Sequence, residues 1–219
     1  MSDTVLIVGV GETIGEATAR QLHGAGYDVG LFARSAPFIE ELAADLGAGA
    51  VAVPTDITDM AAVEAGVERV QAELGQLGAV VLNASAGGGR PIEDASVDRL
   101  QSMLDVRVAG SLACVQAALP DLRETEGTVV FSGTTYAEET APEQVEWGAV
   151  APATQGLAAT LDAALGAVQV TYVSIGTGIA PADTDAGQRL DADELAAVYQ
   201  QLIERDRAVT RRLDVRLRE

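Results

Sequence analysis

The stretch VLIVGVGETIG, from Val5 to Gly15, decides the fold. Its apolar run predicts a buried strand, and the polar, alanine-rich run from Glu16 to Leu22 predicts a helix directly after the turn. Gly9 permits a tight turn, and Gly11 lets a pyrophosphate approach the backbone at the helix N-terminus, where free N–H groups favour an anion. Glycines also occur in ordinary strand-to-helix connections, so the turn alone indicates either a nucleotide site or a plain connection.

The rest of the chain alternates short apolar runs with longer helical stretches. Most runs are continuously apolar, as in strands that helices cover on both faces. The predicted strands are Val5 to Gly9, Val29 to Ala33, Val51 to Val53, Ala79 to Asn83, Thr128 to Gly133, Val170 to Gly176 and Leu213 to Leu217, and the predicted helices lie near 14–24, 36–46, 59–74, 95–119, 152–165 and 191–206. This order predicts an α/β fold with a Rossmann-type, doubly wound, mainly parallel sheet. We expect residues 1–219 to form a single domain.

The charge balance is strongly acidic. The formal net charge is −19, and all 14 basic residues are arginine. Such a surface repels phosphate backbones and argues against nucleic-acid and anionic-membrane partners. Hyperthermophilic proteins tend to be enriched in lysine, so the pattern points instead to a halophilic protein, in a cytoplasm whose molar salt screens the self-repulsion. A cytoplasmic location is also expected because the start MSDTVLIVG shows no targeting signal and no apolar run reaches the ~18 residues of a membrane span.

Single cysteine and histidine residues give no sign of a metal site. Cys114 stands among Leu112, Ala113 and Val115, which predicts a buried packing residue. His23 falls on the first predicted helix without a second histidine or a cysteine nearby, so a surface or packing role is expected.

In a doubly wound sheet the ligand crevice lies at the carboxyl ends of the strands. Arg34 follows the second strand, where an acidic residue would hold a ribose 2′-hydroxyl and an arginine suits a 2′-phosphate; we therefore expect NADP(H) rather than NAD(H). Asp56 follows the third strand and either accepts from an adenine amino group or caps the next helix. The small residues Asn83 to Gly89 follow the fourth strand and would let the chain pass close to a flat ligand.

With these residues in place, the chain resembles the short-chain dehydrogenase/reductase family over nearly its full length. Gly9 and the pair Ile14-Gly15 match the first glycine and the final I-G of the family's TGxxxGIG turn, although Thr13 stands at the middle glycine and Gly11 is extra. The resemblance implies an oxidoreductase, and together with the residues above it predicts a nicotinamide-cofactor site formed by Gly9, Gly11, Thr13, Ile14, Gly15, Arg34, Asp56, Ile57, Asn83, Ala84, Ser85 and Gly176.

Other motifs carry the same resemblance. Asn83-Ala84 match the second Asn and the Ala of NNAG, with Ser85 in place of Gly. The stretch WGAVAPATQGL, from Trp147 to Leu157, is similar to YGASKAALxGL, and Gly176 falls at the family's PG turn. No motif is intact, but their order and spacing are specific.

The resemblance also shows where the chain departs from the family, whose catalytic group is Asn, Ser, Tyr and Lys. Matching the motifs puts Arg107 at the Asn, Thr134 at the Ser, Trp147 at the Tyr and Ala151 at the Lys. Only Thr134 keeps a usable hydroxyl. An indole does not exchange a proton at neutral pH, and a methyl group does not stabilise a phenolate.

The residues support this departure independently of the family. A tyrosine with a pKa near 10 needs a nearby cation to act near neutrality. No basic residue lies between Arg123 and Arg189, so the fifth and sixth strands and the helix between them supply none. The ordinary mechanism is therefore expected to be absent.

Three hypotheses follow from the sequence. The first is an NADP(H)-dependent oxidoreductase with an altered site, in which Tyr136 or bound water donates the proton, Thr134 orients the substrate and Arg107 is the missing cation. The second is a non-catalytic nucleotide-binding sensor or scaffold. The third is a structural or subunit-like partner that binds no dinucleotide.

The resemblance further implies a homodimer or homotetramer, with the helices near 95–119 and 147–165 in the contact. Six arginines crowd the last fifteen residues, and pairing with the chain's own acids or with a partner subunit's is expected of them: Arg205, Arg207, Arg211, Arg212, Arg216 and Arg218. The substrate is not legible, but the loop-like segment from Gly176 to Leu190 contains no aromatic residue, and Trp147 would leave room only for something small.

Overall fold

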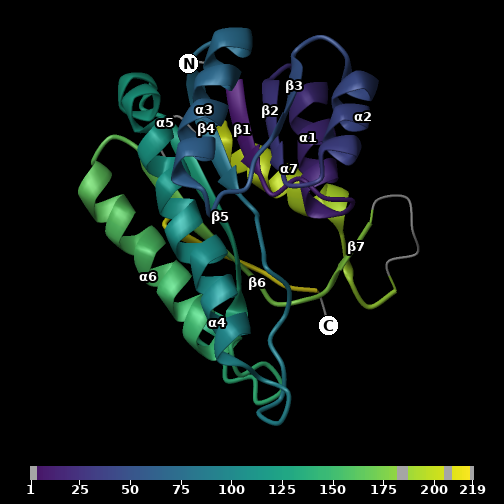
Figure 1. Cartoon of the computed structure of the whole chain (residues 1–219), viewed down its shortest axis with the longest axis vertical. Helices are drawn as coiled ribbons and strands as arrows, with labels where there is room; N and C mark the ends of the chain where they lie inside the picture. The colour runs from purple at the N-terminus through teal and green to yellow at the C-terminus, as the bar shows by residue number, and fades with distance from the viewer. Residues whose placement is uncertain (1–3, 182–186, 205–208, 218–219) are drawn as a thin grey trace.

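A seven-stranded parallel sheet forms the centre of the protein in a computed structural model that describes residues 4–181, 187–204 and 209–217 (Figure 1). The strand order is β3-β2-β1-β4-β5-β6-β9, and every neighbouring pair is parallel. The strands are β1 (Thr4–Val8), β2 (Asp28–Ala33), β3 (Ala50–Pro54), β4 (Leu77–Leu82), β5 (Thr128–Thr134), β6 (Gln169–Ile175) and β9 (Arg212–Val215). The predicted doubly wound α/β fold is confirmed, and the order reverses between β1 and β4.

Helices cover both faces of this sheet. They are α1 (Ile14–Gly24), α2 (Ala36–Leu46), α3 (Met60–Leu74), α4 (Val97–Leu104), α5 (Ser111–Thr125), α6 (Trp147–Leu165) and α7 (Ala192–Ile203). Successive side chains of β1 enter opposite layers: Val5 and Ile7 pack with α1, α2 and α7, whereas Leu6 and Val8 pack with the layer of α3, α5 and α6. Because both faces are buried, the strands are apolar throughout, as their sequences predict.

Two helix boundaries and one loop segment differ from the predicted ones. Helix α6 begins at Trp147 instead of near residue 152, and α5 ends at Thr125 instead of near residue 119. A proline lies inside each of these helices, Pro152 and Pro120, and obscured the helical pattern; packing against the core carries both helices past it. The loop-like segment after Gly176 contains two short paired strands, β7 (Ile179–Ala180) and β8 (Leu190–Asp191).

One long helical stretch bends at its middle. Helices α4 and α5 are joined by a single π-helical segment, η1 (Asp105–Gly110). The whole stretch, Val97–Thr125, is long and apolar enough to cross a membrane by length and composition. It packs here against α3, α6 and β4, and Cys114, Ala118 and Leu122 enter the core, so core packing accounts for its apolar character.

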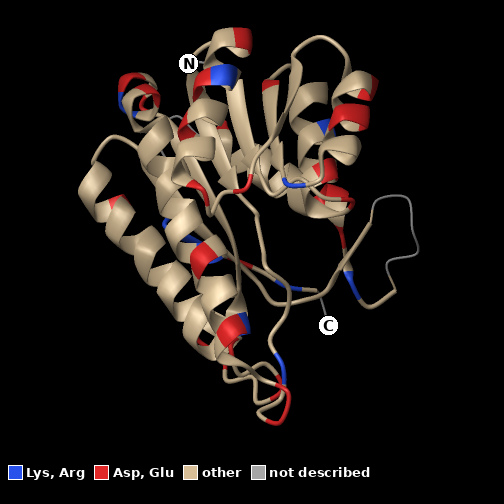
Figure 2. Cartoon of the chain, viewed as in Figure 1, with Lys and Arg blue, Asp and Glu red and all other residues tan. Residues whose placement is uncertain are grey.

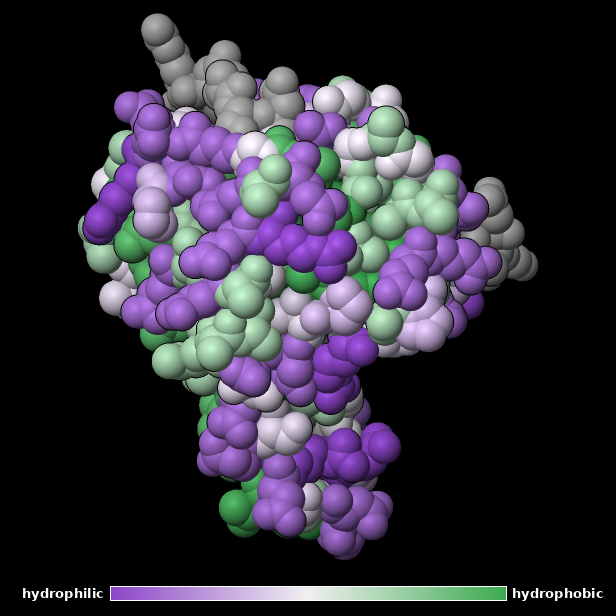
Figure 3. Space-filling model, turned by 45° about the horizontal axis from the view of Figure 1, so that its top comes forward, coloured by the Kyte–Doolittle hydropathy of each residue, from purple (hydrophilic) through white to green (hydrophobic). Residues whose placement is uncertain are grey.

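Charge covers the outside of the molecule unevenly. Figure 2 shows acidic residues on most helices, whereas α6 carries almost none, and the face seen in Figure 3 is largely hydrophilic. The described C-terminal arginines pair with the chain's own acids, which confirms the sequence expectation for them: Arg211 with Asp162 (2.8 Å), Arg212 with Glu138 and Asp214 (2.7 Å for the latter), and Arg216 with Glu139. Arg205, Arg207 and Arg218 lie outside the described residues.

Candidate functional site

The turn after β1 is built around a glycine whose backbone conformation and close contacts disfavour any side chain. Gly9 has φ +89°, and a Cβ on it would stand 2.3 Å from the backbone N of Ala84. A Cβ on Gly15 would stand 2.5 Å from the Cα of Val10. A Cβ on Gly11 would meet nothing within 4 Å, so no contact inside the described chain requires glycine there. Gly9 and Gly15 therefore shape the turn, and Gly11 leaves its outer side open.

Helix α1 begins at Ile14 immediately after this turn. Its N-cap residue, Thr13, makes no side-chain cap hydrogen bond, so the side chain leaves the N–H groups of the first turn to other partners. Two acids lie close by. Glu16 pairs with Arg20 at 2.9 Å, and Glu12 is exposed. The helix N-terminus can thus hold an anion, against a modest opposing charge from Glu12.

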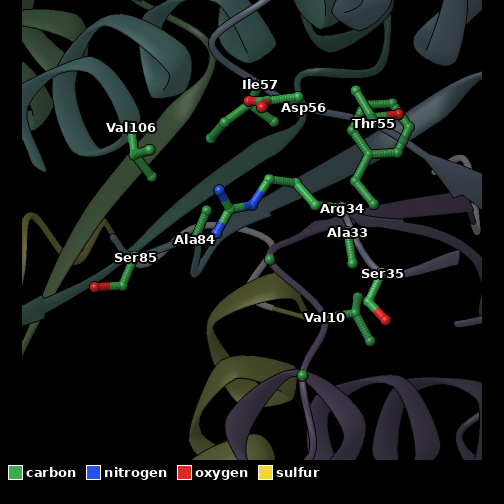
Figure 4. A pocket seen from close by; sticks show the side chains of 13 residues that line it. Val10, Ala33, Arg34, Ser35, Thr55, Asp56, Ile57, Ala84, Ser85 and Val106 are labelled. Atoms are coloured by element: carbon green, nitrogen blue, oxygen red, sulfur yellow. The ribbon is translucent and has the colours of Figure 1, made fainter. Parts of the chain in front are cut away.

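A first crevice of about 290 Å³ opens at the carboxyl ends of β1, β2 and β3. Figure 4 shows the Arg34 side chain extending over it, with Asp56 and Ile57 on one side and Ser35 and Val10 on the other. The crevice is lined by Gly9, Val10, Gly11, Phe32, Ala33, Arg34, Ser35, Thr55, Asp56, Ile57, Ala84, Ser85 and Val106. The structure therefore brings together residues predicted from four separate segments of the sequence.

Arg34 and Asp56 share this crevice without forming an ion pair. Asp56 accepts hydrogen bonds from the Thr58 backbone N (3.0 Å) and the Thr58 hydroxyl (2.8 Å), and these bonds, helped by the charge of Arg34, lower the pKa of its carboxyl. The helix is capped instead by Asp59, which accepts from Ala61 and Ala62. Of the two roles predicted for Asp56, capping the helix is wrong. The Arg34 guanidinium is exposed and, in the described part of the chain, forms no ion pair.

The end of β4 is fastened to the glycine turn. The side-chain amide of Asn83 donates to the carbonyl oxygen of Gly9 at 2.9 Å. Ala84 follows at the close contact with Gly9 described above, and Ser85 lines both crevices. The sequence NAS thus holds two neighbouring strand ends together at the point where the strand order reverses.

A second crevice of about 500 Å³ adjoins the first and shares Gly9, Gly11 and Ser85 with it. It is lined by Gly9, Gly11, Glu12, Thr13, Ile14, Gly15, Asn83, Ser85, Arg107, Ser132, Gly133, Thr134, Trp147, Ile175, Thr177 and Ile179. Three residues predicted to be in or near the active site, Arg107, Thr134 and Trp147, therefore meet in one cavity.

Three other predicted positions do not line either crevice. Ala151 is fully buried, and Gly176 lies between the lining residues Ile175 and Thr177. Tyr136 is half-buried in a 3₁₀ turn, η2 (Thr135–Ala137), where its backbone N lies 3.4 Å from the Thr134 hydroxyl oxygen. Its role as a proton donor stays a prediction.

Arg107 is the cation of the second crevice. Its side chain is only 6% exposed. It donates to the carbonyl oxygens of Ser132 (2.6 Å) and Ala84 (3.2 Å), and its guanidinium carbon lies 5.2 Å from the centroid of the Trp147 ring. Burial lowers the pKa of Arg107, although an arginine stays charged at neutral pH. The π-helical segment η1 directs this side chain at the ends of β4 and β5.

Two tyrosines that the sequence did not single out hold the end of β5. The Tyr199 hydroxyl, from α7, donates to the Ser132 hydroxyl oxygen at 2.8 Å, and the Tyr172 hydroxyl, from β6, lies 3.0 Å from both the N and the O of Thr134. Burial raises the pKa of both tyrosines. A buried tyrosine needs a hydrogen-bond partner for its hydroxyl. Both tyrosines lie within apolar runs of the sequence, and this placement is the signal from which their buried role could have been predicted.

Two loops are joined beside the second crevice. The buried Glu146 carboxylate accepts from the backbone N of Arg90 (2.7 Å) and of Ser96 (3.1 Å), with the Arg99 guanidinium 3.8 Å away. Burial opposes the charged form, but these N–H groups and Arg99 outweigh it and lower the pKa of Glu146. Glu146 immediately precedes Trp147, so this network fixes the start of α6.

No group of residues suited to hold a metal ion occurs in the described parts of the chain. Cys114 is fully buried in the core, and burial raises the pKa of its thiol to about 12, as expected for a packing residue. His23 lies at the surface, with Nε2 2.8 Å from the carbonyl oxygen of Ala48.

Comparison with known proteins identifies a family. The sequence model described as short chain dehydrogenase matches residues 3–216. An uncharacterised oxidoreductase of Staphylococcus aureus (strain MW2) is 34% identical over 183 residues, which cover 80% of this chain and 78% of that protein. One from Staphylococcus epidermidis is 27% identical over 198 residues, which cover 87% and 86%.

Solved structures share the fold. The alcohol dehydrogenase of the archaeon Thermococcus sibiricus, complexed with 5-hydroxy-NADP, superposes with a TM-score of 0.91 at 23% identity and covers 99% of this chain and 97% of its own. The 3-ketoacyl-(acyl-carrier-protein) reductase of Brucella melitensis, complexed with NADH, has a TM-score of 0.88 at 22% identity, with 97% and 96% covered. One of these structures holds an NADP derivative and the other NADH.

Proposed function

Because the chain belongs to the short-chain dehydrogenase family, we propose that it is an NADP(H)-dependent oxidoreductase with a non-standard active site. The observation that carries the NADP(H) preference is Arg34, an exposed guanidinium over the first crevice that forms no ion pair with the described residues. In a chain of net charge −19, a free cation at the end of β2 suits a 2′-phosphate.

The residues along the two crevices fit such a cofactor. Gly9 lets the turn lie directly against Ala84, and Gly11 has open space on its outer side, where a cofactor could approach the backbone. We assign the adenosine side to Arg34, Asp56, Ile57 and Ala84, the pyrophosphate to the turn from Gly11 to Gly15, and the nicotinamide side to Asn83, Ser85 and Gly176. The bound cofactor would supply or accept the hydride.

The chain's own contribution to the chemistry rests on Thr134, Arg107 and a proton donor. The Thr134 hydroxyl orients the reacting oxygen, and the Arg107 guanidinium is the cation of the second crevice. Trp147 and Ala151, at the positions matched to the family's Tyr and Lys, have no group that gives or takes a proton near neutral pH. The proton therefore comes from Tyr136 or from water in the crevice. The placement of Tyr136 outside the crevice lining favours water.

A homo-oligomer accompanies this proposal. Helix α6 has a single charged residue, Asp162, and carries Gly148 and Gly156, where a Cβ would meet nothing within 4 Å. A glycine inside a helix costs about 1 kcal/mol relative to alanine, and nothing inside the described chain requires either one. Close approach of a second copy along α6 would account for both. A cytoplasmic location remains the expectation.

Titration of the purified protein with NADPH and with NADH, in about 2 to 3 M KCl, tests the proposal. Calorimetry measures both affinities, and fluorescence of Trp147, the single tryptophan, reports on the second crevice. Tighter binding of NADPH, followed by turnover of a carbonyl or alcohol panel, is the expected result. Tight binding with no turnover would support a sensor or scaffold, and no binding by a folded sample would overturn the proposal.

A further inference from the structure

Arg107 carries a buried charge that the chain does not neutralise. Its side chain is 94% buried, since 6% is exposed. The groups close enough to act on its charge are the hydroxyls of Tyr172 and Tyr199, with no carboxylate of the described residues among them. An ion buried without a counter-ion is costly, and in proteins such charges are usually paired.

The hydrogen bonds of the guanidinium are also incomplete. Two donations are made, to the carbonyl oxygens of Ala84 and Ser132, and Nε is buried without any partner among the described residues. An arginine has five N–H donors in a planar fork that matches a carboxylate. Trp147 covers one face of the guanidinium. Because Nε is enclosed by the protein, the requirement that a ligand in the crevice can meet is a negative charge beside the guanidinium.

The cavity beside Arg107 is the one that contains Thr134. Both residues line the second crevice, and Arg107 is bonded to Ser132, two residues before Thr134 on the same strand. Two residues of strand span about 6.6 Å. One small ligand, with only a few bonds between its anionic group and its oxygen, can therefore reach Arg107 and Thr134 at the same time. The other charged residue of the lining, Glu12, is exposed to water, which screens it.

We propose that the second crevice takes a small carboxylate-bearing substrate, a short oxo acid or the matching hydroxy acid, whose carboxylate pairs with Arg107 while its reacting oxygen meets Thr134. This inference rests on the proposed function for the hydride step and adds the substrate class. The crevice volume of about 500 Å³, part of which the nicotinamide end of the cofactor would fill, leaves room for a short acid.

Paired probes test the charge directly. Pyruvate and 2-oxobutanoate are each compared with the neutral amide of the same acid, pyruvamide and 2-oxobutanamide, on the protein loaded with NADP⁺, which has no hydride to transfer to an oxo acid. Binding is followed by Trp147 fluorescence and calorimetry, so that no turnover is needed. Because a hydrogen bond from the guanidinium to a charged carboxylate is stronger than one to a neutral amide, we expect the wild-type protein to bind the acid at least about tenfold more tightly than its amide. Equal affinities, or tighter binding of the amide, would overturn the proposal on the wild-type protein alone.

Variants assign the preference to Arg107. Arg107→Gln is expected to abolish the preference for the acid over the amide, and Arg107→Lys is expected to retain part of it. The control is Arg123→Gln, which removes the same charge from the exposed end of α5 and should leave the preference unchanged. A preference that survives Arg107→Gln would overturn the assignment. If Arg107→Gln does not fold, the wild-type comparison and Arg107→Lys still decide.

Failure of the proposed substrate class can be distinguished from failure of the proposed NADP(H)-dependent function. NADPH binding is measured first, without probes. If NADPH does not bind, the proposed function fails, and the probes are titrated alone to decide the anion preference. If NADPH binds but the wild-type protein does not prefer the acids, only the substrate class fails. Weaker NADPH binding by Arg107→Gln, with an unchanged ratio for the probes, would show that Arg107 serves the cofactor instead and would also overturn this inference.

Discussion

The guanidinium carbon of Arg107 lies 5.2 Å from the centroid of the Trp147 ring, so the only tryptophan of the chain covers a buried cation at the start of α6. A cation over an indole face is attracted by the ring quadrupole, more strongly when water is excluded. Arg107 also bonds the backbone at Ala84 and at Ser132, so one side chain ties the ends of β4 and β5 to the start of α6. The positive charge of the site is thereby held in a fixed place.

Arg34 should decide which dinucleotide binds. Arg34→Ala removes the exposed guanidinium over the first crevice, and we expect NADPH affinity to fall about tenfold or more, with NADH affinity nearly unchanged. Arg34→Lys, which keeps the charge but not the planar fork, should fall between the two. Calorimetric titration measures all three. An equal loss for both cofactors would show that Arg34 does not read the 2′-phosphate.

The two glycines of the turn should behave differently. Gly9→Ala places a Cβ 2.3 Å from the Ala84 N at a φ of +89°, and we expect it to lower the free energy of unfolding by about 2 kcal/mol or more. Gly11→Ala, where a Cβ meets nothing within 4 Å, should leave stability nearly unchanged and weaken cofactor binding. Urea unfolding compares the two variants, and a Gly9→Ala protein as stable as the wild type would contradict the geometry of this turn.

Removing the Tyr136 hydroxyl should show whether Tyr136 or water donates the proton. Tyr136→Phe removes a hydroxyl that lies outside the crevice lining, and retained turnover would assign the proton to water. Complete loss of turnover with intact NADPH binding would assign it to Tyr136. Steady-state rates in light and heavy water, measured with the wild type beside the variant, show whether proton transfer limits the rate.

Thr134 should be required in either case. Thr134→Val keeps the side-chain shape without the hydroxyl, and we expect turnover to fall about a hundredfold or more, as for a lost hydrogen bond at the reacting oxygen. Thr134→Ser should restore most of it. Full activity of Thr134→Val would remove Thr134 from the mechanism.

A bulky residue in place of an exposed glycine of α6 should disrupt the proposed oligomer. Gly156→Leu places a bulky side chain on the face proposed to meet a second copy, and we expect light scattering to show a monomer. Gly24→Leu is the matched control, because a Cβ there also meets nothing within 4 Å but the residue ends α1, away from α6. A wild-type protein that is already monomeric in high salt would count against the proposal.

Salt should stabilise the folded state. A net charge of −19 gives a self-repulsion that screening weakens, so the unfolding midpoint is expected to rise between about 0.1 and 3 M KCl. Thermal unfolding at several KCl concentrations measures the effect. Stability that does not depend on salt would refute the halophilic interpretation.

The sequence by itself determined the sheet and its cofactor edge. Continuous apolar runs separated by helical stretches predicted the parallel strands, because strands covered on both faces need no polar alternation. Gly9 and Gly15 marked the turn, and Arg34 and Asp56 were placed at the first crevice by their position after strands, which in a parallel sheet end at one edge.

The tertiary structure decided what lies around the reacting end of the crevice. The sequence predicted Arg107 as the cation of the altered site, but only the π-helical bend of η1 and the ends of β4 and β5 show that its partners are two carbonyl oxygens and Trp147. Tyr172 and Tyr199 are separated from β5 by 38 and 67 residues at their hydrogen bonds. Contacts of that span depend on how whole strands and helices pack, and no local pattern of residues encodes them.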